Sequence, residues 1–95
     1  MENRKIIYRP GKTSGHLWSK LDELKNKYRD IISKEKIEIS LTRTGANIKA
    51  SKKLFIKFWI DLDIKILDGQ YELTWKTNIP KSKISEALGK IEKML

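Results

Sequence analysis

Residues 54–67 read LFIKFWIDLDIKIL and alternate in character along their whole length. Every even position from Leu54 to Ile66 is apolar, whereas the odd positions carry aromatic, acidic, basic and aliphatic side chains. Because successive side chains of a strand point to opposite faces of a sheet, this pattern predicts a long strand with one buried face. The opposite, mixed face is expected to meet water or a partner, so a function is expected to lie there.

The dipeptide Asp68-Gly69 follows this strand and predicts a tight two-residue hairpin of type I′, with positive φ at both central residues. Residues 70–78 then form the returning strand. The expected pairs are Ile66 with Tyr71, Ile64 with Leu73 and Leu62 with Trp75 inside, and Lys65 with Glu72 and Asp61 with Lys76 outside. A slip of one residue would place aromatic side chains opposite charges, so both faces favour this register.

The strand of residues 54–67 is also unusually long. Fourteen residues would extend for about 46 Å at about 3.3 Å per residue, so we expect a bend or bulge. Upstream, residues 36–43 and 46–51 alternate and predict two strands joined by a turn at Thr44-Gly45, with Leu41 opposite Ile48 and Ile39 opposite Ala50. A turn at residues 51–53 would then lead into the long strand.

Two amphipathic helices complete the pattern. Residues 5–9 predict a first strand that ends at Pro10-Gly11, and a helix capped by Thr13 or Ser14 follows. Its apolar stripe is Leu17, Leu21, Leu24, Tyr28 and Ile31. After Ile79-Pro80, Ser82 is the expected cap of a closing helix with the stripe Ile84, Leu88, Ile91 and Leu95. The order β-α-β-β-β-β-α predicts an α+β two-layer sandwich, a mostly antiparallel sheet with both helices on one face.

Composition favours one soluble domain over residues 1–95 with an acidic partner. The chain has no cysteine, no apolar run of signal-peptide or membrane-spanning length, and a net charge of +9, so a cytoplasmic protein without disulfides is expected. Residues 1–53 hold 14 Lys and Arg against 6 Asp and Glu, whereas residues 54–95 hold 7 against 6. Such asymmetry suits nucleic acid or an anionic surface, although a solvated basic surface is the alternative.

The loop before the first helix is a candidate anion site. Pro10-Gly11-Lys12-Thr13 ends like a phosphate-binding loop, but Ile6 stands where the first glycine of that motif would be. Weak anion binding by Lys12, Thr13, Ser14 and His16 at the helix start remains an option, beside an ordinary capped helix.

Neither a metal site nor a catalytic site is expected. Asp61 and Asp63 lie two apart on one strand face, as metal ligands would, but Lys76 and Lys65 are placed to pair with them, so ion pairs are favoured. His16 is the only histidine and has no companion for a zinc or catalytic site. No cofactor is expected.

The outer face of the long strand is the main candidate binding surface. Phe55 and Trp59 lie on it among Lys49, Lys57 and Lys76. Aromatic rings interleaved with lysines on an open sheet are typical of platforms that stack single-stranded nucleic acid. The same surface equally suits a homodimer interface, and a bend in the strand could instead bury the rings.

Residues 62–95 resemble the C-terminal part of the polyhydroxyalkanoate granule-associated (polyhydroxyalkanoic acid system) family. The shared features are a strand, an acidic turn at Asp68-Gly69, a strand that ends at Ile79-Pro80, and a closing helix. Pro10 stands where that family usually has a histidine. The resemblance implies a non-enzymatic protein of storage-polymer granules, with no catalytic residues. The sequence therefore predicts a non-catalytic interaction protein, whose partner is a granule surface or nucleic acid.

Overall fold

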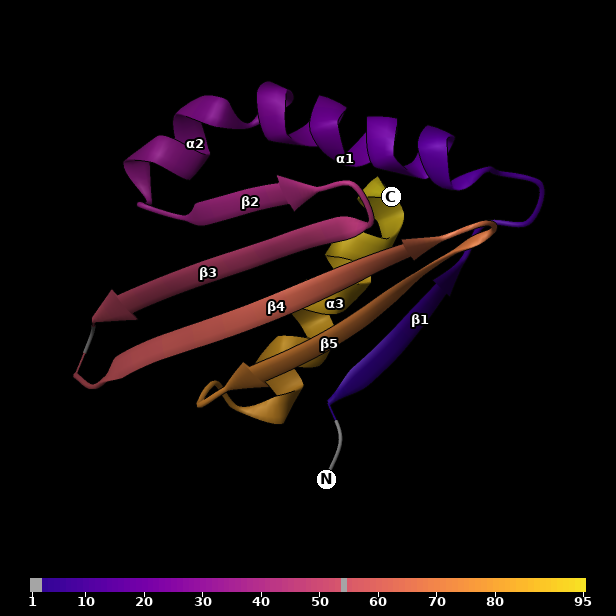
Figure 1. Cartoon of the computed structure of the whole chain (residues 1–95). Coiled ribbons are helices and arrows are strands. Elements are labelled where there is room, and N and C mark those ends of the chain that lie inside the picture. Colours follow the sequence, from indigo (N-terminus) through magenta and orange to yellow (C-terminus); the bar gives the residue numbers. More distant parts are fainter. Residues whose placement is uncertain (1–2, 54) are drawn as a thin grey trace.

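The alternating stretch forms the central strand of a five-stranded antiparallel sheet with the order β1-β5-β4-β3-β2 (Figure 1). The computed structural model describes residues 3–53 and 55–95. The elements are β1 (Arg4–Tyr8), α1 (Ser14–Lys27), α2 (Arg29–Lys34), β2 (Glu38–Thr42), β3 (Gly45–Lys53), β4 (Lys57–Leu67), β5 (Gln70–Thr77) and α3 (Lys81–Met94). None of the helices in the described ranges is long and apolar enough to cross a bilayer.

One face of the sheet carries the core, and both long helices cover it. The even-numbered residues of β4 from Ile60 to Ile66 meet Leu17 and Leu21 of α1 and Ile84 and Leu88 of α3 in a single apolar cluster. In Figure 1, α3 lies behind the sheet and α1 runs above β2. The buried members of the cluster are Ile7, Leu17, Leu21, Ala46, Leu62, Ile64, Ile66, Tyr71, Leu73, Ile84 and Leu88. The predicted two-layer α+β sandwich is confirmed.

The predicted β4–β5 register is confirmed at all five expected pairs, from Ile66 opposite Tyr71 to Asp61 opposite Lys76. The predicted turn type is wrong, because Gly69 has a positive φ of 78° but Asp68 does not. The loop before α1 holds the turn from outside the hairpin. Arg9 N donates to Gly69 O at 2.7 Å, and Gly69 N donates to Lys12 O at 2.8 Å. These contacts come from a distant part of the chain, so the local dipeptide could not specify the conformation.

The other two strand registers differ from the predictions by even numbers of residues. Leu41 lies opposite Ala46 rather than Ile48, because the chain turns at residues 43–44. The expected turn at residues 51–53 is also wrong, since β3 continues to Lys53, which pairs with Lys57. The chain therefore reverses between Lys53 and Lys57, and Leu54, which was expected to begin the long strand, lies outside the described residues. The pairing from Gly45–Lys65 to Lys53–Lys57 is continuous, so β4 is shorter than expected and has no bulge along that ladder.

The first helix is interrupted where one continuous helix was predicted. Tyr28 takes φ −102° and ψ 21° and separates α1 from α2. Leu17 and Leu21 are buried, but α2 contributes no buried residue and Ile31 is 55% exposed. The second half of the predicted stripe instead lines an apolar hollow of about 270 Å³ between α1, α2, β2, β3 and the end of α3. In α3 the expected cap is also wrong, because Pro80, without a side-chain hydrogen bond, precedes the helix rather than Ser82.

Tyr71 ties the sheet to α1. Its side chain is fully buried, and its hydroxyl donates a hydrogen bond of 2.9 Å to the carbonyl oxygen of Leu17. Burial raises the pKa of Tyr71 from 10.0 to about 12, although the positive charge of Arg9 lowers it in part. The neutral phenol is therefore the form that the fold requires.

We expect the wild type to lose stability between about pH 10 and 12 more steeply than Tyr71→Phe. The unfolded tyrosine, with a pKa of about 10, loses its proton first as pH rises, so the contribution is complete below that pKa. The difference in slope should approach about 1.4 kcal/mol per pH unit. Urea unfolding of both proteins at a series of pH values measures it, and lysine deprotonation affects both alike. Parallel pH profiles would show that Tyr71 ionises as easily in the folded state as in the unfolded state.

Candidate functional site

The β3–β4 hairpin extends beyond both of its neighbours. The pairing of β2 with β3 ends at Glu38 and Lys49, and the pairing of β5 with β4 ends at Thr77 and Ile60. Figure 1 shows the far end of the hairpin beyond β2 and β5. Residues 50–53 of β3 and 57–59 of β4 thus form a two-stranded extension of the sheet, with Phe55 and Ile56 near its end.

This extension is basic and unusually apolar for an exposed segment. Residues 50–60 contain Lys52, Lys53 and Lys57 and no acidic residue. Phe55 is fully exposed, Ile56 is 59% exposed and Trp59 is 40% exposed. Exposed apolar side chains that gather in one place usually mark a binding surface.

A hollow of about 430 Å³ opens beside Trp59, and we call it the outer-face hollow. Its charged lining residues are Lys36, Lys49, Lys57, Glu38 and Asp61. Two backbone contacts with the end of β5 fix Trp59: its N–H donates to Asn78 Oδ1 at 2.8 Å, and its carbonyl accepts from Thr77 Oγ1 at 2.6 Å. The backbone that carries the Trp59 indole is thus fixed, and the ammonium groups of Lys36, Lys49 and Lys57 line the same hollow.

The structure brings together some of the predicted binding residues and separates others. Trp59, Lys49 and Lys57 share the outer-face hollow, and Phe55 lies near the hairpin end, outside it. Lys76 lies in the same cross-strand row as Lys49, with Asp61 between them. The outward position of Trp59 in the continuous β3–β4 ladder, opposite Ser51, excludes burial by a bulge.

Lys36 is the lysine of the outer-face hollow that sequence patterns missed. It has a φ of 54° and follows α2, where Ile37 N donates to Ile32 O at 2.9 Å and Lys36 N donates to Ser33 O at 3.2 Å. This is the Schellman arrangement, in which glycine is the usual left-handed residue. A glycine would have signalled the helix end, and a lysine gave no such signal.

The two carboxylates of β4 are held by an amide rather than by lysines. Asn47 Nδ2 donates to Asp61 Oδ1 at 2.8 Å and to Asp63 Oδ1 at 2.7 Å. The salt bridges expected with Lys76 and Lys65 do not form within the described residues, where the ion pairs are Arg4–Glu72, Lys5–Glu92 and Lys90–Glu86. Across residues 3–53 and 55–95, no group of three or more acidic, histidine or cysteine side chains gathers as metal ligands.

The predicted anion site at the start of α1 already holds a carboxylate of the protein. Thr13 Oγ1 accepts a hydrogen bond from His16 N at 3.2 Å, as an N-cap does. Asp68 Oδ1 accepts from Ser14 N at 2.7 Å, so the β4–β5 turn supplies the negative group. The exposed Lys12 contributes its carbonyl oxygen to Gly69 N. An external anion would have to compete with Asp68 for the N–H of Ser14.

The outer-face hollow combines the Trp59 indole with three lysines and two carboxylates. Stacking on Trp59 and attraction to Lys36, Lys49 and Lys57 are the interactions it can supply. Glu38 and Asp61 at its edge restrict where a negative group can sit. No protein-family model, curated protein or solved structure matches this chain.

Proposed function

We propose that this protein is a small, non-catalytic binding domain that holds single-stranded nucleic acid on the exposed part of its β3–β4 hairpin. The observation that carries the proposal is the outer-face hollow, which places Trp59 beside Lys36, Lys49 and Lys57. A base stacked on an aromatic side chain contributes about 1 to 3 kcal/mol, whichever base it is. The ammonium groups supply the attraction to phosphate that dominates such complexes.

The shape of the hairpin supports a strand rather than a duplex as the ligand. Phe55 and Trp59 lie on the same extension, so a flexible strand that follows the hairpin can meet two aromatic rings. Bases in a duplex are already stacked and do not offer their faces to side chains. The net charge of +9 adds a long-range attraction that does not depend on sequence.

Trp59→Ala is expected to weaken binding of a fluorescent single-stranded oligonucleotide about tenfold or more, through loss of the stacked base. The matched control is Tyr8→Ala, which removes another exposed aromatic ring from the outer face, on the edge strand β1. Fluorescence anisotropy measures the affinities, and thermal melting measures the stability of each variant. The Trp59→Ala variant should remain folded at the temperature of the binding assay, so that its loss of affinity exceeds what any loss of stability explains.

The same experiment contains the results that would contradict the proposal. Binding by the wild type should fall steeply between about 50 and 200 mM salt, since phosphate contacts release counterions. No binding at low salt, or equal losses in Trp59→Ala and Tyr8→Ala, would remove strand binding by this hairpin. A large melting loss in Trp59→Ala with unchanged affinity would mean that the indole acts in folding.

Association with storage-polymer granules is the second candidate, and the hairpin end favours it. Phe55 and Ile56 are exposed between Lys53 and Lys57, an arrangement suited to an apolar surface with charged edges. The resemblance to the granule-associated family points the same way. Cosedimentation with polyhydroxyalkanoate granules should then be lost in the Phe55→Ser, Ile56→Ser double variant. Retention of the double variant on granules would exclude this end as the contact.

A homodimer through the same face is the remaining partner proposal. Sedimentation of the wild type and of Trp59→Ala over a range of concentrations separates it from the others. Self-association that is lost in Trp59→Ala without loss of stability would assign the hairpin to a dimer interface.

A further inference from the structure

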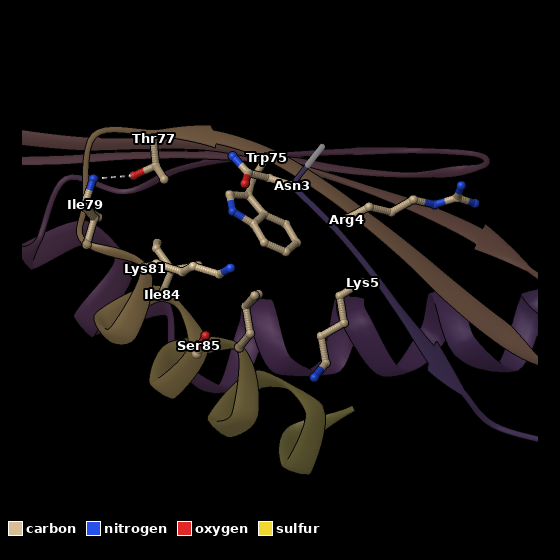
Figure 2. A pocket seen from close by; sticks show the side chains of 10 residues that line it. Asn3, Arg4, Lys5, Trp75, Thr77, Ile79, Lys81, Ile84 and Ser85 are labelled. Carbon is tan, nitrogen blue, oxygen red and sulfur yellow. Dashed lines mark hydrogen bonds between the residues drawn. The ribbon is translucent and has the colours of Figure 1, made fainter. Parts of the chain in front are cut away.

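A third recess lies on the helix-covered face of the sheet, away from the outer-face hollow. This groove has a volume of about 620 Å³ and runs between β1, the end of β5 and the first turns of α3 (Figure 2). We call it the β1–α3 groove. Its lining includes Trp75, Ile84, Leu88, Lys5, Lys81 and Ser85. The volume falls within the range of about 300 to 1,000 Å³ that is usual for small-molecule sites.

The indole of Trp75 and apolar side chains of α3 line the β1–α3 groove. Trp75 is half-buried, and the groove side of α3 presents the buried residues Ile84 and Leu88. The backbone N–H of Trp75 donates to the carbonyl oxygen of Asn3 at 3.2 Å, which fixes the strand that carries the indole. Figure 2 shows the indole ring in the middle of the recess. A planar group can therefore lie against it.

The charged lining of the β1–α3 groove is entirely basic. Arg4, Lys5 and Lys81 line it, and none of its lining residues is acidic. Arg4 pairs with Glu72 at 3.2 Å and Lys5 with Glu92 at 3.8 Å, whereas Lys81 forms no ion pair within residues 3–53 and 55–95. In Figure 2 the Lys81 side chain extends beneath the Trp75 ring, whereas the Arg4 side chain points away from that ring. Lys81 is thus the ammonium group that is free beside the indole.

We propose that the β1–α3 groove binds a small aromatic anion, with its ring against Trp75 and its acidic group at Lys81. A neutral apolar ligand would make no use of the Lys81 ammonium group, which forms no ion pair within the described residues, and a simple inorganic anion would leave the indole and Ile84 uncovered. An aromatic carboxylate or phosphate satisfies both parts of the groove. Lys5 also lines the groove, but its charge is already paired with Glu92 of the same helix. This site goes beyond strand binding and does not depend on it, because it lies on the other face of the sheet.

Isothermal titration with four probes tests the proposal on the full chain. AMP and 2-naphthoate each combine a ring with an anion, whereas adenosine has only the ring and inorganic phosphate only the anion. We expect AMP or 2-naphthoate to bind at least tenfold more tightly than adenosine and phosphate. The tighter of the two is then the probe for the variant proteins.

Lys81→Ala should weaken binding of the tighter probe about tenfold. Lys83→Ala is the matched control, because Lys83 is an exposed lysine of the same helical turn that does not line the groove. Trp75→Phe should keep most of the affinity, and Trp75→Leu should lose it. If Trp75→Leu does not fold, the probe affinities of Lys81→Ala and Lys83→Ala still test whether the ligand binds in the groove.

Three results would overturn the proposal. Equal affinities for phosphate, AMP and 2-naphthoate would show that the indole takes no part in binding. Equal effects of Lys81→Ala and Lys83→Ala would show a general charge effect. Loss of AMP binding in Trp59→Ala with full retention in Lys81→Ala would place the ligand in the outer-face hollow instead.

Discussion

Gly45→Ala is expected to lower the free energy of unfolding by about 3 kcal/mol or more, although it adds only one methyl group. Gly45 is buried at the start of β3, opposite Lys65 of β4. A Cβ atom at this position would lie 1.9 Å from the carbonyl oxygen of Ile64. That oxygen belongs to the backbone of the central strand, so it cannot turn aside as a side chain would. The strand pair must therefore separate locally.

Gly89→Ala provides the matched control for this prediction. Apart from its chain neighbours and the nearby backbone of its own helix, no atom lies within 4 Å of a Cβ placed at Gly89, which is inside α3. Alanine in a helix interior is favoured over glycine by about 0.5 to 1 kcal/mol, so this variant should be more stable than the wild type. Urea unfolding of the two variants should thus give shifts of opposite sign. A neutral Gly45→Ala would mean that β3 and β4 do not approach as closely as described.

The alternation of side chains predicted which face of each strand is buried, but it did not determine every register. A shift of two residues preserves the alternation, so Leu41 faces Ala46 without any change of face. Only the β4–β5 hairpin carried further information, because its outer pairs Lys65–Glu72 and Asp61–Lys76 match charges as well as faces. The correct register was predicted where both faces constrained it.

The helix ends and the turn conformation depended on contacts between distant segments. Asp68 accepts the hydrogen bond from Ser14 N, and Gly69 is held between Arg9 and Lys12. The break between α1 and α2 at Tyr28 likewise has no glycine or proline near it that would predict it from the sequence. Local sequence patterns indicate at which residues a helix or strand can begin or end. Contacts with distant segments determine which of these positions the folded protein uses.

The two candidate sites differ in how far the sequence could predict them. Trp59, Lys49 and Lys57 belong to one hairpin, so alternation alone placed them on a common face. The β1–α3 groove joins Lys5, Trp75 and Lys81 from three elements. Predicting this groove would require knowing that β1 pairs with β5. The sequence pattern of residues 5–9 does not contain that information.

Ile64→Ala is expected to cost about 2 to 5 kcal/mol of unfolding free energy, as a truncation in the closed core. Ile64 is 4% exposed at the centre of β4, where it lies between Ala46 of β3 and Leu73 of β5. Removal of its outer carbons leaves a cavity that three paired strands cannot readily close. Chemical unfolding with urea gives the loss directly.

Two further isoleucine variants separate the core effect from the loss of an apolar side chain as such. Ile64→Leu keeps the volume and should cost less than about 1.5 kcal/mol. Ile56→Ala removes the same atoms from the exposed hairpin end and should stay within about 0.5 kcal/mol of the wild type. If Ile64→Ala were as mild as Ile56→Ala, the even face of β4 would not be the buried one. The outward position of Trp59, and with it the outer-face hollow, would then have to be abandoned, because both follow from the same alternation.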